Sequence, residues 1–135
     1  PLYSSAASDV YKRQVYCDVT GLKRVNDEEG HSKGDQWILR ACDCLRGTLK
    51  EFDLFRIGGD EFVALCRGME EGELYREVEE LRTELDRKKV TMAVGAAVNT
   101  LGAVGFDHLL TEPERRMYQD KAEYYRKSGL NRRRQ

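Results

Sequence analysis

The chain has few cysteines and histidines, the residues that form disulfides and zinc sites. It has four cysteines and two histidines in 135 residues. None of the cysteines shows C-x-x-C spacing, and the histidines complete no zinc pattern. We therefore expect the thiols to be buried or incidental in a reducing cytoplasm. The four are Cys17, Cys42, Cys44 and Cys66.

Long hydrophobic runs and an excess of one charge are also missing. Lysine and arginine number 23 and aspartate and glutamate 24, for a formal net charge of −1. Bulk electrostatics therefore favours neither a nucleic acid nor a membrane surface as a partner. No apolar stretch reaches the roughly 20 residues that cross a bilayer, and no signal peptide is visible. We expect a single cytoplasmic domain without a membrane segment; a longer parent protein could still carry an anchor.

The first fourteen residues, Pro1 to Gln14, show no clear hydrophobic periodicity. We interpret residues 1–14 as a non-native or disordered leader and assign residues 15–135 to one domain.

Hydrophobic periodicity within that domain predicts an ordered series of strands and helices. Strands are expected over Val15–Val19, Leu54–Ile57, Phe62–Cys66 and Val90–Val98. Helices are expected from near Ser32 to about Lys50, over Glu71–Arg87 and over Glu114–Ser128, with a loop over Asn99–Gly105. The order β-α-β-β-α-β plus a trailing helix predicts an α+β, ferredoxin-like antiparallel sheet with helices packed on one face.

A pair of glycines followed by two acids joins the two middle strands. Gly58 and Gly59 predict a tight hairpin, because glycine reaches positive φ without steric cost. Adjacent residues of a strand point to opposite sides, so Asp60 and Glu61 are expected to serve different purposes. A solvated acidic turn is the alternative interpretation.

Three linked motifs give the chain a family resemblance. They are Asp18-Val19-Thr20-Gly21-Leu22-Lys23 with Asn26-Asp27, then Gly30-His31-Ser32-Lys33-Gly34-Asp35, then Gly58-Gly59-Asp60-Glu61-Phe62. From about Val15 to Arg133 the chain resembles the GGDEF family of diguanylate cyclases. The resemblance implies condensation of two GTP into cyclic di-GMP by a homodimer. It also implies that an N-terminal helical segment, and a sensor domain before it, are missing from this sequence.

The resemblance assigns metal and catalytic roles to the acids. Asp18 and Asp60, with the carbonyl of Val19, would hold Mg²⁺ or Mn²⁺, which prefer oxygen ligands. Glu61, beside Asp60, would receive the proton of the attacking 3′-hydroxyl; the alternative is that it only shapes the turn. Gly58 and Gly59 would let the backbone approach the nucleotide.

The resemblance also assigns residues to the nucleotide. Asn26 and Asp35 would bind the guanine edge, where an amide and a carboxylate match its donors and acceptors. Gly21, Leu22, Lys23 and Lys121 would bind phosphates. The alternatives are a helix cap for Asp35 and ordinary exposed lysines for Lys23 and Lys121.

Four departures from the family pattern stand out. Thr20 occupies the place of a second acid, Leu22 that of a phenylalanine, and Tyr125 that of an arginine. The stretch Leu49–Phe52 lacks the product-inhibition motif R-x-x-D, so we expect no tight feedback binding of cyclic di-GMP there.

Two other functions compete with catalysis. A degenerate member would bind GTP and regulate a partner, an idea favoured mildly by Thr20 and Tyr125. An RNA-binding module is suggested by the basic end Arg132–Arg134, but such modules need aromatics that stack bases on central strands. The aromatics Tyr16, Phe55 and Phe62 do not form that signature, so no nucleic-acid partner is expected.

Overall fold

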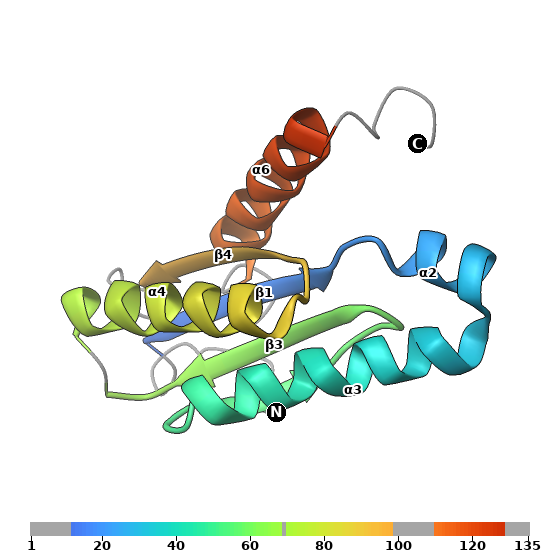
Figure 1. Cartoon of the computed structure of the whole chain (residues 1–135). Coiled ribbons are helices and arrows are strands. Elements are labelled where there is room, and N and C mark those ends of the chain that lie inside the picture. Colours follow the sequence, from blue (N-terminus) through green and yellow to red (C-terminus); the bar gives the residue numbers. More distant parts are fainter. Residues whose placement is uncertain (1–11, 69, 99–109, 129–135) are drawn as a thin grey trace.

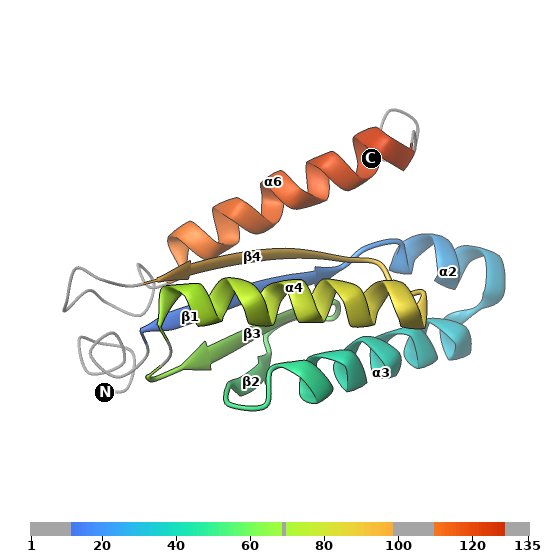
Figure 2. The ribbon, with the colours of Figure 1, turned by 60° about the vertical axis from the view of Figure 1, so that its left-hand side comes forward.

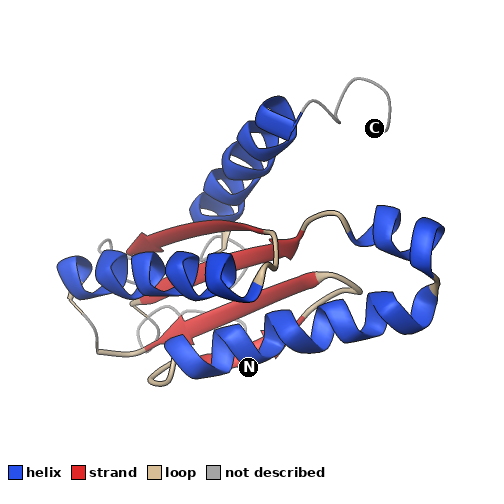
Figure 3. Cartoon of the chain, in the orientation of Figure 1, coloured by secondary structure: helices blue, strands red, loops and turns tan. Residues whose placement is uncertain are grey.

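The computed structural model describes residues 12–68, 70–98 and 110–128. Their elements, in chain order, are β1 (Arg13–Val19), α2 (Leu22–Glu29), α3 (His31–Thr48), β2 (Asp53–Arg56), β3 (Glu61–Cys66), α4 (Glu71–Lys88), β4 (Met92–Val98) and α6 (Thr111–Ser128). Figure 3 shows the helices and strands in separate colours. The predicted α+β class is confirmed; the predicted loop Asn99–Gly105 lies outside the described residues.

The four strands form one sheet in the order β2-β3-β1-β4, and every neighbouring pair is antiparallel (Figure 1). Strand β1 therefore lies in the middle, between the hairpin strand β3 and the later strand β4. Its register pairs Asp18 with Glu61 on β3 and with Ala93 on β4. The last residues of this central strand thus lie at the end of the sheet where the β2–β3 turn is found.

Helices cover both faces of the sheet (Figure 2). Alternate residues of β1, such as Val15, Cys17 and Val19, pack with buried residues of α3 and α4 in the main core. The intervening residue Tyr16 packs with Met117 of α6 on the opposite face. The prediction of helices on one face is therefore wrong for the trailing helix, which closes the β1–β4 part of the second face.

Helix α6 approaches β4 closely at Gly95. A Cβ built on Gly95 would lie 2.1 Å from the carbonyl oxygen of Pro113 and 2.2 Å from the backbone nitrogen of Met117. Contacts this short exclude any side chain, so Gly95 is what lets the helix backbone rest on the strand. The close packing sets the position of the first part of α6 relative to β4.

Two boundaries differ from the sequence prediction. Arg13 and Gln14 belong to β1 and pair with β3 and β4, so assigning them to a leader is wrong; residues 1–11 lie outside the described part. The sequence predicts no helix between Val19 and Ser32, but α2 occupies Leu22–Glu29. Gly21 and Gly30 flank this helix with φ of 79° and 91°, values that favour glycine.

Within the described residues, no helix is long and apolar enough to cross a membrane.

Candidate functional site

The site is built where β1 ends beside the β2–β3 turn. The backbone N–H of Val19 donates to the carbonyl oxygen of Asp60 at 2.8 Å. Asp18 is directly opposite Glu61, so their side chains leave the sheet on the same face. The backbone pairing therefore brings Asp18, Asp60 and Glu61 to one place, although more than 40 positions separate Asp18 from the other two.

Asp18 is the most buried of these acids, with 3% of its surface exposed. Its Oδ2 accepts a hydrogen bond from Nζ of Lys121 on α6 at 3.1 Å, whereas its buried Oδ1 has no hydrogen-bond partner in the described part of the chain. Burial raises the pKa of Asp18 to about 6, against the opposing effect of Lys121, and the charges of Asp60 and Glu61 raise it further. A buried carboxyl with one free oxygen and neighbouring acids is a natural place for a cation.

The donors at this place suit a hard divalent ion. They are carboxylate oxygens of two acids together with the backbone oxygen of Val19, all ligands that Mg²⁺ prefers. The described residues contain no cluster of three or more His, Cys, Asp or Glu side chains arranged for a metal. A cation here would need further oxygens from elsewhere, and phosphate oxygens of a nucleotide meet that need. Asp18, Asp60 and the carbonyl of Val19 therefore suit Mg²⁺ or Mn²⁺ as ligands. Binding of the metal stays a prediction.

Glu61 lies at the start of β3 on the α6 face. The hydroxyl of Tyr16 donates to Oε1 of Glu61 at 3.4 Å. Burial and the charge of Glu61 raise the pKa of Tyr16, which therefore stays a neutral hydrogen-bond donor. The carboxylate is partly exposed and held by one contact, so it can still meet a substrate. Its catalytic role stays a prediction.

The turn before Glu61 is not held by left-handed glycines. Among the described residues only Gly21, Gly30 and Lys89 have positive φ, so that explanation of the Gly58-Gly59 turn is wrong. Instead, the guanidinium of Arg56 donates to the carbonyl oxygens of both Gly58 and Gly59. A Cβ on Gly59 would meet nothing within 4 Å, which leaves the backbone of the turn approachable.

The predicted phosphate residues fall into two groups. Gly21 is the N-cap of α2, so Leu22 and Lys23 lie in the first turn of a helix, a position that favours anions. Lys23 itself is 85% exposed and pairs with Asp27 at 3.0 Å, which is how an ordinary surface lysine behaves. Lys121 is 30% exposed and points to Asp18. The structure therefore brings Lys121, and not Lys23, to the acids.

The predicted guanine residues lie where α2 packs on α3. A Cβ on Gly34 would stand 1.7 Å from Oδ1 of Asn26, so the two helices touch at this point. The Oδ1 atom is buried and has no hydrogen-bond partner among the described residues, which is unusual for a buried polar atom. Asp35 follows Gly34 and is exposed. Asn26 and Asp35 are thus neighbours across the helix pair, and their role in binding a base stays a prediction.

Sequence reasoning missed two supporting residues, Arg56 and Tyr16. The only local signal for Arg56 was a cation two residues before a glycine pair. Tyr16 is two residues before Asp18, on the same face of β1, so strand periodicity could have found it.

Leu49 and Phe52, where the R-x-x-D motif would lie, are buried core residues.

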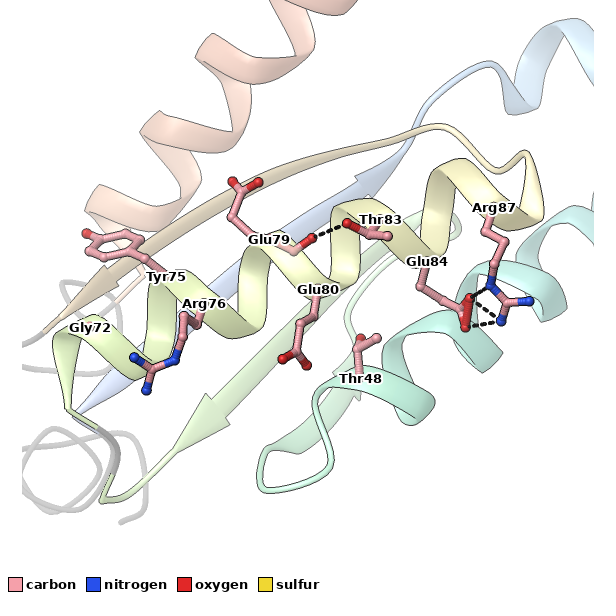
Figure 4. A pocket seen from close by; sticks show the side chains of 9 residues that line it. All are labelled: Thr48, Gly72, Tyr75, Arg76, Glu79, Glu80, Thr83, Glu84 and Arg87. Carbon is pink, nitrogen blue, oxygen red and sulfur yellow. Dashed lines mark hydrogen bonds and ion pairs between the residues drawn. The ribbon is translucent and has the colours of Figure 1, made fainter.

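A hollow between α4 and the end of α3 is lined by residues such as Thr48, Tyr75 and Glu80, and by none of the predicted site residues (Figure 4).

Comparison with known proteins agrees with the fold and the motifs. The chain is 30% identical over 89 residues to "Diguanylate cyclase DosC" of Escherichia coli K12, a match covering 65% of this chain and 19% of the relative. It is 27% identical over 126 residues to "Probable diguanylate cyclase DgcT" of the same organism, covering 82% of this chain and 28% of the relative. The chain thus spans between 19% and 28% of the length of these relatives.

A solved structure of a microbial GGDEF domain, described as showing a novel interaction mode with cyclic di-GMP, superposes with a TM-score of 0.73 at 25% identity. The superposition covers 88% of this chain and 80% of that one. The family model "Diguanylate cyclase, GGDEF domain" matches residues 5–127, a range that begins within the predicted leader. On this match, which spans most of its length, the chain belongs to the GGDEF family of diguanylate cyclase domains.

Proposed function

We propose that this domain condenses two molecules of GTP into cyclic di-GMP with release of pyrophosphate, and that it needs Mg²⁺ or Mn²⁺ to do so. The observation that carries the proposal is the meeting of Asp18, Asp60 and Glu61 beside Lys121 at one end of β1. Phosphoryl transfer depends mainly on positioning and on neutralising charge. A bound divalent ion supplies that neutralisation, and this cluster has the carboxylates to hold it.

The residues divide the work of one transfer. The 3′-hydroxyl oxygen of one GTP forms a bond to the α-phosphorus of the other, and the bond from that phosphorus to the bridging oxygen of pyrophosphate breaks. Glu61 accepts the hydroxyl proton. Asn26 and Asp35 select guanine, and the N-terminus of α2 with Lys121 holds the phosphates. A second, equivalent transfer closes the ring.

Two copies of the domain are needed because the product has two-fold symmetry. Each copy holds one GTP, and the two sites face each other in a homodimer. The matched relatives are several times longer than this chain. We infer that a sensor region elsewhere in the parent protein brings the copies together, and that the domain acts in the cytoplasm, where GTP is available.

A degenerate regulator is the second candidate. Thr20 is 1% exposed and its Oγ1 has no partner, so the place of the family's second acid is neutral here. Such a domain would bind GTP and transmit its presence to a partner without forming product.

The test is product formation by a forced dimer. The chain is fused to a short dimeric coiled coil and incubated with GTP and Mg²⁺, and cyclic di-GMP and pyrophosphate are measured by chromatography. We expect both products from the wild-type fusion. Glu61→Gln should lower the rate by about 100-fold or more, as loss of a general base does, with GTP binding retained. Glu80→Gln, the same change on the exposed face of α4, should leave the rate unchanged.

GTP binding without product in the wild-type fusion would favour the regulator. Absence of both binding and product would refute the proposal.

A further inference from the structure

The N-terminus of α2 is a ready anion site, and the following inference rests on the proposed function. Gly21 caps the helix without a side-chain hydrogen bond. The first hydrogen bond of the helix runs from the N–H of Val25 to the carbonyl of Gly21. The N–H groups of Leu22, Lys23 and Arg24 therefore have no acceptor within the helix and point out of its end.

Two buried polar atoms of the chain just before this helix have no hydrogen-bond partner among the described residues. They are Oγ1 of Thr20, the residue before Gly21, and Oδ1 of Asp18. Both residues are more than nine-tenths buried. Alternation along the chain places Thr20 on the same side as Asp18, the side that α6 covers. Unpartnered buried oxygens next to free N–H groups indicate a place that a ligand completes.

A tyrosine hydroxyl from α6 reaches the same place. A Cβ built on Gly21 would lie 3.8 Å from the hydroxyl oxygen of Tyr124 and 3.7 Å from Oγ1 of Thr91. Thr91 already uses its proton, which it donates to the carbonyl oxygen of Thr20 at 3.0 Å. The Tyr124 hydroxyl makes no hydrogen bond to another described residue, and its half-buried ring lies edge-on to Tyr125. Tyr124 therefore presents a free donor beside the helix end.

The cations near this end of α6 each already pair with a carboxylate. Arg126 pairs with Glu123 and is exposed, and Lys23 pairs with Asp27. Lys121, one helical turn before Tyr124, pairs with Asp18. A phosphate at the α2 N-terminus would thus meet helix N–H groups and one side-chain hydroxyl before it meets an unpaired charge among the described residues.

We propose that Tyr124 is a substrate-binding residue that donates its hydroxyl hydrogen to a terminal phosphate of GTP held at the N-terminus of α2. The Tyr124 hydroxyl thereby donates to the phosphate a hydrogen bond that an arginine or lysine commonly donates in other proteins.

The test compares nucleotides that differ only in their phosphates. Affinities of the 135-residue chain for GTP and GMP, both with Mg²⁺, are measured by displacement of a fluorescent GTP derivative. Tyr124→Phe removes one oxygen that bonds to no described residue, so the fold is expected to survive, and thermal unfolding checks this. A hydrogen bond to a charged group predicts GTP binding about tenfold weaker, and GMP binding unchanged. Tyr75→Phe is the control. It makes the same change on α4, where the Tyr75 hydroxyl accepts a hydrogen bond from Arg116 near the start of α6, and it should alter neither affinity.

A second variant tests the position rather than the hydroxyl. Tyr124→Arg places a cation at the phosphate, so it should bind GTP at least as tightly as the wild type and lose affinity more steeply with salt. The inference is overturned if Tyr124→Phe binds GTP within twofold of the wild type, or if either variant weakens GTP and GMP equally. Failure of the wild type to bind GTP would instead remove the proposed function, and this inference with it.

Discussion

At the scale of single residues, Asp18 is the acid whose charge is least favourably placed in the site. Its carboxyl is buried, receives one hydrogen bond from Lys121, and keeps one oxygen without a partner. Burial is the largest influence on its pKa, ahead of Lys121. The ion pair therefore only partly offsets the cost of removing the charge from water. The charged form of Asp18 therefore lowers the stability of the fold, as expected of a residue that serves the proposed site rather than the core.

This imbalance predicts a dependence of stability on pH. The folded protein holds the Asp18 proton with a pKa of about 6, above its ordinary value of 3.8. The stability contributed by the protonated form is therefore fully present below about pH 4 and is lost as the pH rises toward 6. In buffer without divalent ions, the free energy of unfolding of the wild type relative to Asp18→Asn should fall by about 1–2 kcal/mol between pH 4 and pH 7.

Urea unfolding of both proteins across that range measures the difference. Asp43→Asn, a change on the exposed face of α3, provides the control and should show no such trend. A wild type that instead gains stability over Asp18→Asn as the pH rises would mean that Lys121 outweighs burial.

At the scale of elements, the packing of α2 on α3 sets the position of Asn26, the residue that we propose binds the base. Gly34 lies against the amide of Asn26, whose Oδ1 is buried and free. The glycine is required because the amide occupies the space that a Cβ would fill. The motif Gly30-His31-Ser32-Lys33-Gly34-Asp35 thus combines a positive-φ junction between two helices at Gly30 with a close contact at Gly34.

Gly34→Ala should therefore change nucleotide selection more than stability. The new Cβ would lie 1.7 Å from Oδ1 of Asn26, so the amide, the end of a flexible side chain, must turn away. Loss of its contact to guanine should weaken GTP binding by about tenfold, while binding of ATP, which does not use that contact, stays weak and unchanged.

Displacement titrations with the two nucleotides measure the effect. Gly47→Ala, on the same helix with nothing within 4 Å of the new Cβ, is the matched control and should keep the GTP preference. An unchanged GTP-to-ATP ratio in Gly34→Ala would exclude Asn26 from guanine recognition.

Much of the element order could be predicted from the sequence, and the exceptions have physical causes. Helices α3 and α4 were found because their buried residues recur at helical spacing. Helix α2 was missed because it is eight residues long and buries only Val25. The bond between Lys121 and Asp18, 103 positions apart, depends on the packing of α6 at Gly95, which no local pattern encodes. The resemblance, and not the periodicity, predicted that Asp18 and Asp60 would meet.

At the scale of the whole molecule, the described helices cover the α6 face of the sheet only in part. Helix α6 packs on β4 and β1, and among the described elements no helix packs on β2 from that face. Phe55, which pairs with Val63 and so points to this face, is 45% exposed. Tyr118 of α6 is 52% exposed. Since Glu61 lies between these regions, a second copy that approaches this face would bring its own nucleotide to the acids.

Catalysis by two facing copies predicts a rate that depends on chain concentration. On the proposed mechanism, one domain holds one GTP and cannot complete the product alone, so turnover per chain should rise in proportion to concentration while monomers dominate. The fusion with a dimeric coiled coil should turn over at a constant rate per chain over the same range. Cyclic di-GMP formation between about 0.1 and 50 µM chain, with the oligomeric state followed by light scattering, tests both expectations. A rate per chain that is independent of concentration in a monomeric, unfused protein would show that one domain suffices and would remove the need for a symmetric pair.

Glu61→Gln chains mixed with wild-type chains sharpen the test, because a dimer with one base can make only one of the two bonds. Product formation should then fall with the square of the wild-type fraction, whereas independent domains would lose it linearly.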